Sequence, residues 1–139
     1  MLVMVVDGKG GGIGVSLIEK IKEKKLDVDI IGVGTNSIAM SGMNKLGVDC
    51  ASGENPVVYN AGKADFILGP MGILTANAMF GEITPKMAHA ISESEAKKIL
   101  IPMNKCNVIT VGVVNKSINE YIEEAVSILK EEVEKKKSR

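Results

Sequence analysis

A cluster of glycines near the N-terminus is the feature with the clearest chemical meaning. Residues 5–15 read Val-Val-Asp-Gly-Lys-Gly-Gly-Gly-Ile-Gly-Val, so five glycines separate an apolar run from a segment with helical periodicity. Glycine lacks a Cβ and reaches positive φ cheaply, which lets a ligand approach the main chain. A helix starting there would direct unpaired amides and its positive dipole end at an anion. The segment predicts a binding loop for a nucleotide or other phosphorylated small molecule.

The glycine spacing narrows this prediction. From Gly8 the pattern is Gly-x-x-x-Gly-Ile-Gly, which resembles the cofactor loop of short-chain dehydrogenases. The standard Gly-x-Gly-x-x-Gly fingerprint fails because Ile13 stands at its third glycine, and no Gly-Lys-Ser/Thr completes a Walker loop. The alternative is a tight turn that binds nothing. The predicted ligand-binding residues of this loop are Gly8, Gly10, Gly11, Gly12, Ile13 and Gly14.

Three side chains are candidates for catalysis. Asp7 could hold a ribose hydroxyl or a metal-bound water, or it could only cap the loop. Lys9 could neutralise a phosphate, or it could be a solvated loop charge. Cys106 has Lys105 beside it, which would favour the thiolate, although packing is the commoner role. No metal site is expected, because the chain has one histidine and two distant cysteines.

The rest of the chain alternates strand and helix patterns. A Ser117–Glu120 pair with the spacing of a capping box predicts the start of the last helix. The expected strands are residues 2–6, 29–33, 48–51, 65–68, 98–101 and 108–113, and the expected helices are residues 13–24, 38–46, 56–62, a helix from the Thr84–Pro85 pair, and a closing helix. Only six residues separate the last two strands, too few for a parallel crossover, so we expect an antiparallel hairpin at one edge.

This order predicts one α/β domain spanning residues 1–139, a three-layer Rossmann-like sandwich with a mostly parallel sheet. The carboxyl edge of the sheet should carry the ligand. Besides the glycine loop, it would carry small and amide residues that follow three other strands. These further predicted ligand contacts are Thr35, Asn36, Ser37, Gly69, Pro70, Gly72 and Asn104.

Composition excludes several classes of function. Seventeen basic residues balance seventeen acidic ones, and only two Tyr and two Phe are available for stacking, so nucleic acid is not an expected partner. No apolar run approaches the roughly 20 residues of a membrane span, and no cationic leader precedes the first strand, so we expect no membrane association and a cytoplasmic location.

Four stretches resemble a family of small bacterial proteins known only as domain of unknown function 3842. They are residues 7–14, 34–39, 81–85 and 101–107, and the resemblance extends over nearly the entire chain. It implies a Rossmann-like fold and brings no assigned reaction, catalytic residue or ligand.

Two observations bear on a dehydrogenase function. An NAD site needs Asp or Glu at the end of the second strand, but residues 34–36 read Gly-Thr-Asn, which argues against NAD and leaves NADP open as a cofactor. Tyr59 and Lys63 match the Tyr-x-x-x-Lys pair of short-chain dehydrogenases, but they precede the fourth strand, so we interpret the match as accidental.

Residues 71–80 are unusually apolar for a segment beside a ligand edge. They could form a buried helix or the surface of a homodimer. Three functional hypotheses therefore follow. The first is a protein that binds a nucleotide or phosphorylated small molecule, the second is a minimal enzyme acting on such a substrate, with an NADP-type reductase the least favoured form, and the third is a ligand-sensing or scaffold subunit of a complex.

Overall fold

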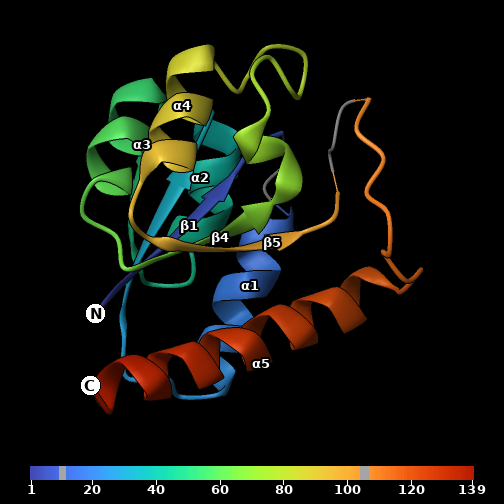
Figure 1. Cartoon of the computed structure of the whole chain (residues 1–139). Coiled ribbons are helices and arrows are strands. Elements are labelled where there is room, and N and C mark those ends of the chain that lie inside the picture. The colour runs from blue at the N-terminus through green and yellow to red at the C-terminus, as the bar shows by residue number, and fades with distance from the viewer. Residues whose placement is uncertain (10–11, 104–106) are drawn as a thin grey trace.

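A five-stranded parallel sheet forms the centre of the protein in a computed structural model, which describes residues 1–9, 12–103 and 107–139 (Figure 1). The strand order is β3-β2-β1-β4-β5, and helices cover both faces. The elements are β1 (Leu2–Asp7), α1 (Gly12–Glu23), β2 (Asp29–Gly34), α2 (Ser37–Asn44), β3 (Asp49–Ser52), α3 (Glu54–Ala61), β4 (Phe66–Pro70), the 3₁₀ turn η1 (Met71–Leu74), α4 (Pro85–Glu93), β5 (Lys97–Ile101) and α5 (Ile118–Lys137). The predicted three-layer Rossmann-like sandwich is confirmed.

The central position of β1 follows from its composition. Its side chains alternate between two cores: Val3 and Val5 pack with residues of α1 and α5, whereas Met4 and Val6 pack with residues of α3 and α4. All four side chains are fully buried. A strand covered on both faces must be apolar at every position, which explains the unbroken run at residues 2–6.

Side-chain caps set the starts of three helices where the sequence indicated them. Asn36 accepts a hydrogen bond from the amide of Ala39, Thr84 accepts one from Met87, and Ser117 forms the predicted capping box with Glu120. Helix α3 begins earlier than predicted, because Gly53 rather than Asn55 precedes its first turn.

The predicted antiparallel hairpin is wrong. Strand β5 lies parallel to β4, with Phe66 opposite Lys97 and Pro70 opposite Ile101. Residues 108–113 form no strand and are mostly exposed. This segment is the connection from β5 to α5, and Gly112 turns the chain with a φ of 86°. The β propensity of the Val-Ile-Thr-Val run is therefore overridden by the need to reach a helix that packs beside α1.

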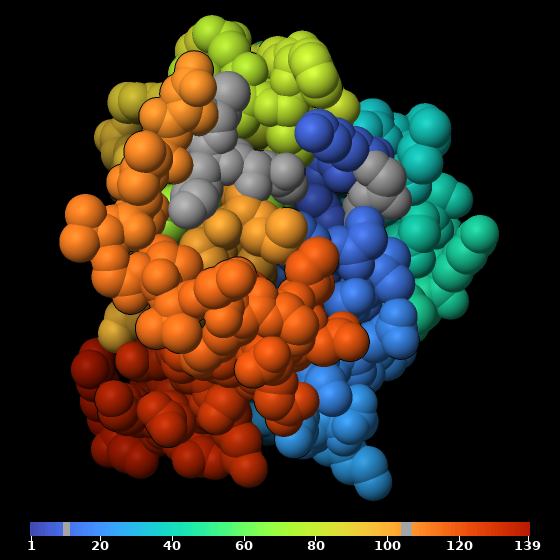
Figure 2. Space-filling view, turned by 90° about the vertical axis from the view of Figure 1, so that its right-hand side faces the viewer, coloured from blue at the N-terminus to red at the C-terminus, as the bar shows by residue number. Residues whose placement is uncertain are grey.

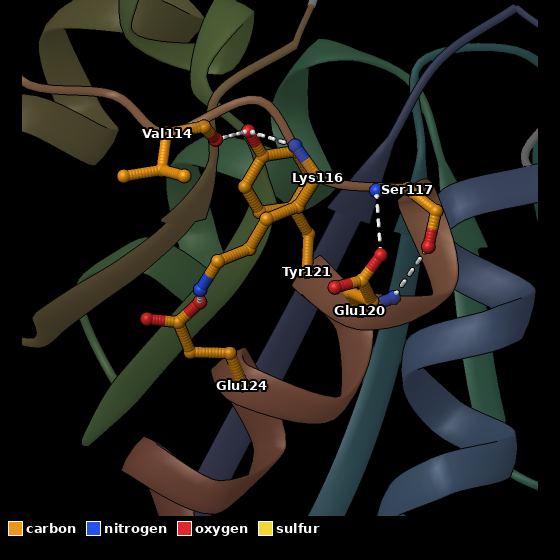
Figure 3. A network of polar contacts seen from close by, with 6 residues as sticks. All are labelled: Val114, Lys116, Ser117, Glu120, Tyr121 and Glu124. Carbon is orange, nitrogen blue, oxygen red and sulfur yellow. Dashed lines mark hydrogen bonds and ion pairs between the residues drawn. The ribbon is translucent and has the colours of Figure 1, made fainter.

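The connection is tied to the start of α5 through Tyr121 and Lys116 (Figure 3). The Tyr121 hydroxyl donates to the carbonyl of Val114 and accepts a hydrogen bond from the Lys116 amide at 3.3 Å. The Lys116 ammonium lies 2.7 Å from a carboxylate oxygen of Glu124. These contacts hold one end of the connection, while Ile109 and Val111 remain 92% and 95% exposed.

A groove of about 320 Å³ lies between this connection, β5 and α5. Its walls are mainly aliphatic and include Ile101, Val113 and Ile128, with Lys116, Tyr121 and Glu124 at its polar side.

Residues 71–80 do not form a helix beyond the single turn of η1. Ile73 and Ala78 are fully buried, and Met79 is nearly so. Phe80 is 99% exposed. Part of the segment therefore contributes to the core beneath α4, whereas Leu74, Ala76, Asn77 and Phe80 are exposed.

No helix in the described part of the chain is long and apolar enough to cross a membrane.

The spacing of β1 and β4 depends on the absence of a side chain at Gly69. A Cβ at this position would lie 2.4 Å from the carbonyl oxygen of Val6, which the sheet prevents from moving. We expect Gly69→Ala to lower the free energy of unfolding by about 2 kcal/mol, measured by urea denaturation. In the control Gly12→Ala, no described atom lies within 4 Å of the new Cβ, so stability should stay within about 1 kcal/mol of wild type. Equal stability of the two variants would contradict this packing argument.

Candidate functional site

The candidate site lies at the carboxyl ends of β1, β2 and β4. Strand β1 has β2 on one side and β4 on the other, and the helices that follow β1 and β4 cover opposite faces of the sheet. Such a reversal leaves a crevice at the carboxyl edge, where open α/β sheets bind ligands. In Figure 2 the loop after β1 (blue), residues 71–84 (yellow-green) and the segment after β5 (orange) share one face of the molecule.

Asp7, the last residue of β1, closes the base of the glycine loop. Its two carboxylate oxygens accept hydrogen bonds from the amides of Gly8 at 2.8 Å and Gly14 at 2.6 Å. Burial raises the pKa of Asp7 above its ordinary value, although bonds from the Gly14, Gly8 and Ile13 amides oppose the shift; the charge of Glu82 adds to it. The side chain therefore caps the first turn of α1 and occupies amides that an anionic ligand would otherwise use.

Glu82 connects the glycine loop to the residues that follow β2. One oxygen, Oε1, accepts hydrogen bonds from the Thr35 hydroxyl at 2.6 Å, the Asn36 side-chain amide at 2.8 Å and the Lys9 backbone amide at 3.0 Å. Burial acts to raise the pKa of Glu82, but these hydrogen bonds outweigh it and hold the pKa below its ordinary value. The carboxylate is therefore charged at neutral pH.

The glycines of the loop differ in what surrounds them. A Cβ on Gly8 would lie 2.5 Å from Met79 Sδ, 2.8 Å from Thr35 Oγ1 and 3.2 Å from Glu82 Oε1, so the protein itself fills that space. Gly12 is exposed, and apart from its chain neighbours and the α1 backbone no described atom lies within 4 Å of the place where its Cβ would stand. Among the described residues, Gly12 therefore has space beside it where Gly8 has none.

Lys9 provides a positive charge at the mouth of the loop. Its side chain is exposed, and its ammonium lies 5.3 Å from the centre of the Phe80 ring. The backbone of Lys9 has a φ of 50°, an uncommon conformation outside glycine. Lys9 and Phe80 therefore mark the solvent side of the site.

The structure brings together part of the predicted residue set. Thr35 and Asn36 reach the site through Glu82, and Ser37 is exposed at the first residue of α2. Gly69, Pro70 and Gly72 are buried and pack within the fold. Ile13 is half-buried in the first turn of α1. Four predicted residues lie outside the described part of the chain: Gly10, Gly11, Asn104 and Cys106.

Sequence reasoning missed Glu82 as a site residue. Its partners are 46, 47 and 73 residues away in the chain, so no local spacing could reveal the contact. The available signal was an acidic residue between Gly81 and the Thr84–Pro85 helix start, within a stretch that carries the family resemblance.

Two further features can be placed relative to the site. Tyr59 and Lys63 contact each other at 2.5 Å, near the end of α3 that leads into the amino end of β4, which is the opposite edge of the sheet. Among residues 1–9, 12–103 and 107–139, no group of three His, Cys, Asp or Glu side chains is arranged to hold a metal ion.

Comparison with known proteins identifies the family. Residues 2–134 match the family described as domain of unknown function (DUF3842). The chain belongs to this family. None of the curated proteins compared with the chain matches it. The family assignment carries no reaction or ligand, so the chemistry of this DUF3842 member must be argued from its own site.

The capping role of Asp7 can be tested by stability. Asp7→Ala leaves two buried amides without their acceptor, and we expect a loss of about 2 kcal/mol in the free energy of unfolding, measured by urea denaturation. Asp27→Ala is the control, because Asp27 is exposed and its ion pair with Lys137 lies at the surface; its effect should stay within about 0.5 kcal/mol. An Asp7→Ala protein as stable as wild type would contradict the capping role.

Proposed function

We propose that this protein binds a phosphorylated small molecule, of the nucleotide class, at the loop between β1 and α1. The observation that carries the proposal is the environment of Gly12. Gly12 is a helical residue of α1, and apart from its chain neighbours and the backbone of that helix no described atom approaches the place of its Cβ, so the described fold has no need of glycine there. In a helix interior glycine costs up to about 1 kcal/mol relative to alanine, so glycine brings no conformational advantage at the start of α1. A ligand that approaches the main chain at this position would explain why glycine stands there.

Three properties of the surroundings support an anionic ligand. Gly12 is the first residue of α1, so the positive end of the helix dipole lies beside the open space. The Lys9 ammonium is exposed at the same loop. The crevice between β1 and β4 is the place where this strand order binds ligands. Because Asp7 occupies the Gly14 amide, the phosphate would lie on the Gly12 side of the loop.

The experiment is a thermal-shift screen of the purified protein with and without Gly12→Val. The ligands are NAD, NADP, ATP, GTP, nucleoside monophosphates, coenzyme A and sugar phosphates. A ligand that binds only the folded state raises the melting temperature by mass action, and we expect this rise to disappear in Gly12→Val because the side chain fills the open space. The melting temperature without ligand should change little, since valine is no worse than glycine in a helix.

Gly62→Val is the matched control for this screen. Gly62 ends α3 with a φ of −74°, which any residue adopts, and it lies near the amino end of β4, away from the proposed site. The control should retain the ligand-induced rise. A rise that survives in Gly12→Val, or no rise with any compound in wild type, would contradict the proposed site.

A second candidate function is a contact surface for another copy of the chain. It is favoured by the connection between β5 and α5, where Ile109, Val111 and Val114 are 92%, 95% and 66% exposed beside a largely aliphatic groove. Burying these side chains would stabilise a homodimer. We expect light scattering to give twice the chain mass for wild type and the monomer mass for Val111→Asp; a wild-type monomer would contradict this candidate.

A further inference from the structure

A carboxylate from a distant part of the chain, that of Glu82, lies at the end of β2. Strand β2 ends at Gly34, and Thr35 and Asn36 follow, so the acidic residue that would hold a ribose in a dinucleotide site is absent from this position. Glu82 reaches the same position from the segment between η1 and α4. Its Oε1 accepts hydrogen bonds from the Thr35 hydroxyl and the Asn36 amide at 2.6 and 2.8 Å.

The hydrogen bonds to the Glu82 side chain orient its carboxylate through one of the two oxygens, Oε1. Three donors, from Lys9, Thr35 and Asn36, converge on Oε1. Within the described residues no hydrogen bond reaches Oε2. The side chain is only half-buried, so Oε2 can meet a ligand. An ionised carboxylate accepts hydrogen bonds and donates none, which suits it to hydroxyl groups and opposes a phosphate.

The loop that carries Glu82, residues 75–84, has an unusual backbone. Asn77, Met79 and Phe80 have φ values of 67°, 58° and 57°, and Gly81 follows at 90°. Each positive φ in a residue other than glycine costs energy, so the surrounding contacts must hold this shape. Hydrogen bonds do so within the loop, including Ile83 to Ala78 at 3.2 Å and Asn77 to Ile83 at 2.7 Å.

Two other side chains of this loop, Met79 and Phe80, lie next to the glycine loop. Met79 is buried against Gly8, whose missing Cβ leaves room for its sulfur and for Glu82 Oε1. Phe80 is 99% exposed and lies beside Lys9, so its ring contributes little to the core and is available to stack against a planar group. The 75–84 loop thus presents an oriented carboxylate and an exposed aromatic ring next to the glycine loop.

We propose that Glu82 Oε2 accepts a hydrogen bond from a ribose hydroxyl, and that the ligand is therefore a ribonucleotide with free 2′ and 3′ hydroxyls. This inference rests on the proposed function, because the glycine loop holds the phosphate of the same ligand. Glu82 acts as a specificity-determining residue. It selects ribose over 2′-deoxyribose and repels a 2′-phosphate, so NAD is preferred to NADP although β2 itself ends without an acid.

The experiment compares ligand pairs that differ only at the ribose, by isothermal titration calorimetry. The pairs are the four common ribonucleoside monophosphates with their 2′-deoxy counterparts, and NAD with NADP; pyrophosphate and glucose 6-phosphate serve as phosphates without a nucleoside. For wild type we expect the ribose form to bind roughly tenfold or more tightly than its partner. In Glu82→Gln, that ratio should fall towards one, because the amide is neutral and Oε2 is lost or rotated.

Glu54→Gln is the matched control. Glu54 also binds the end of the 75–84 loop, through the Thr84 hydroxyl at 2.6 Å, but from α3 and without contact to Thr35 or Asn36. It should retain the wild-type ratio. A ratio that falls equally in Glu54→Gln would mean that loop order, rather than the Glu82 carboxylate, sets the preference, and would overturn the inference.

The possible results separate this inference from the proposed function. If ribose and deoxyribose forms bind equally to wild type, or pyrophosphate binds as tightly as any nucleotide, the glycine loop still binds phosphate and the ribose role of Glu82 is wrong. If Glu82→Gln strengthens pyrophosphate binding and leaves the ribose ratio unchanged, Glu82 competes with the phosphate and the inference is also wrong. If no compound binds, both proposals fail. If Glu82→Gln does not fold, the ratio of ribose to 2′-deoxyribose binding in the wild-type protein still tests the inference.

Discussion

The carboxyl edge of this protein depends on the hydrogen bonds that converge on Glu82 Oε1. Through them the 75–84 loop is joined to the glycine loop at Lys9 and to the end of β2 at Thr35 and Asn36. The end of β2 and the glycine loop also meet directly, because the Asn36 side-chain amide donates to the Lys9 carbonyl at 3.0 Å. The Glu82 carboxylate adds the 75–84 loop to this contact. A single charged group thus fixes the 75–84 loop against the other two segments of the edge where the site lies.

A second carboxylate, Asp7, has a related effect on the glycine loop. Because it accepts the amides of Gly8 and Gly14, it stabilises the start of α1 and reduces the number of amides open to an anion. The two carboxylates also repel each other, and this contributes to the raised pKa of Asp7. The site is therefore a mixed one, with Lys9 and the helix dipole favouring an anion at one end and Glu82 favouring hydroxyl groups at the other.

The fold was largely predictable from the sequence because its signals are local. The apolar run of β1 and the caps at Asn36, Thr84 and Ser117 each act within a few residues. The wrong predictions concern segments whose conformation depends on distant partners. Residues 108–113 have the composition of a strand but do not pair with the edge strand β5, because the chain continues from them to α5, which packs beside α1. Residues 71–80 have the composition of a helix but must bury Ile73 and Ala78 beneath α4.

The sequence by itself determined the alternating α/β order, the position of the glycine loop and the starts of α2, α4 and α5, because each depends on residues that are neighbours in the chain. Only the tertiary structure decided which glycines face open space and which are filled by the protein, as the contrast between Gly12 and Gly8 shows. It also decided that the end of β2 has a carboxylate, because Glu82 lies 46 and 47 residues along the chain from Asn36 and Thr35. Contacts over such separations form only when the sheet and its connections bring distant loops to one edge.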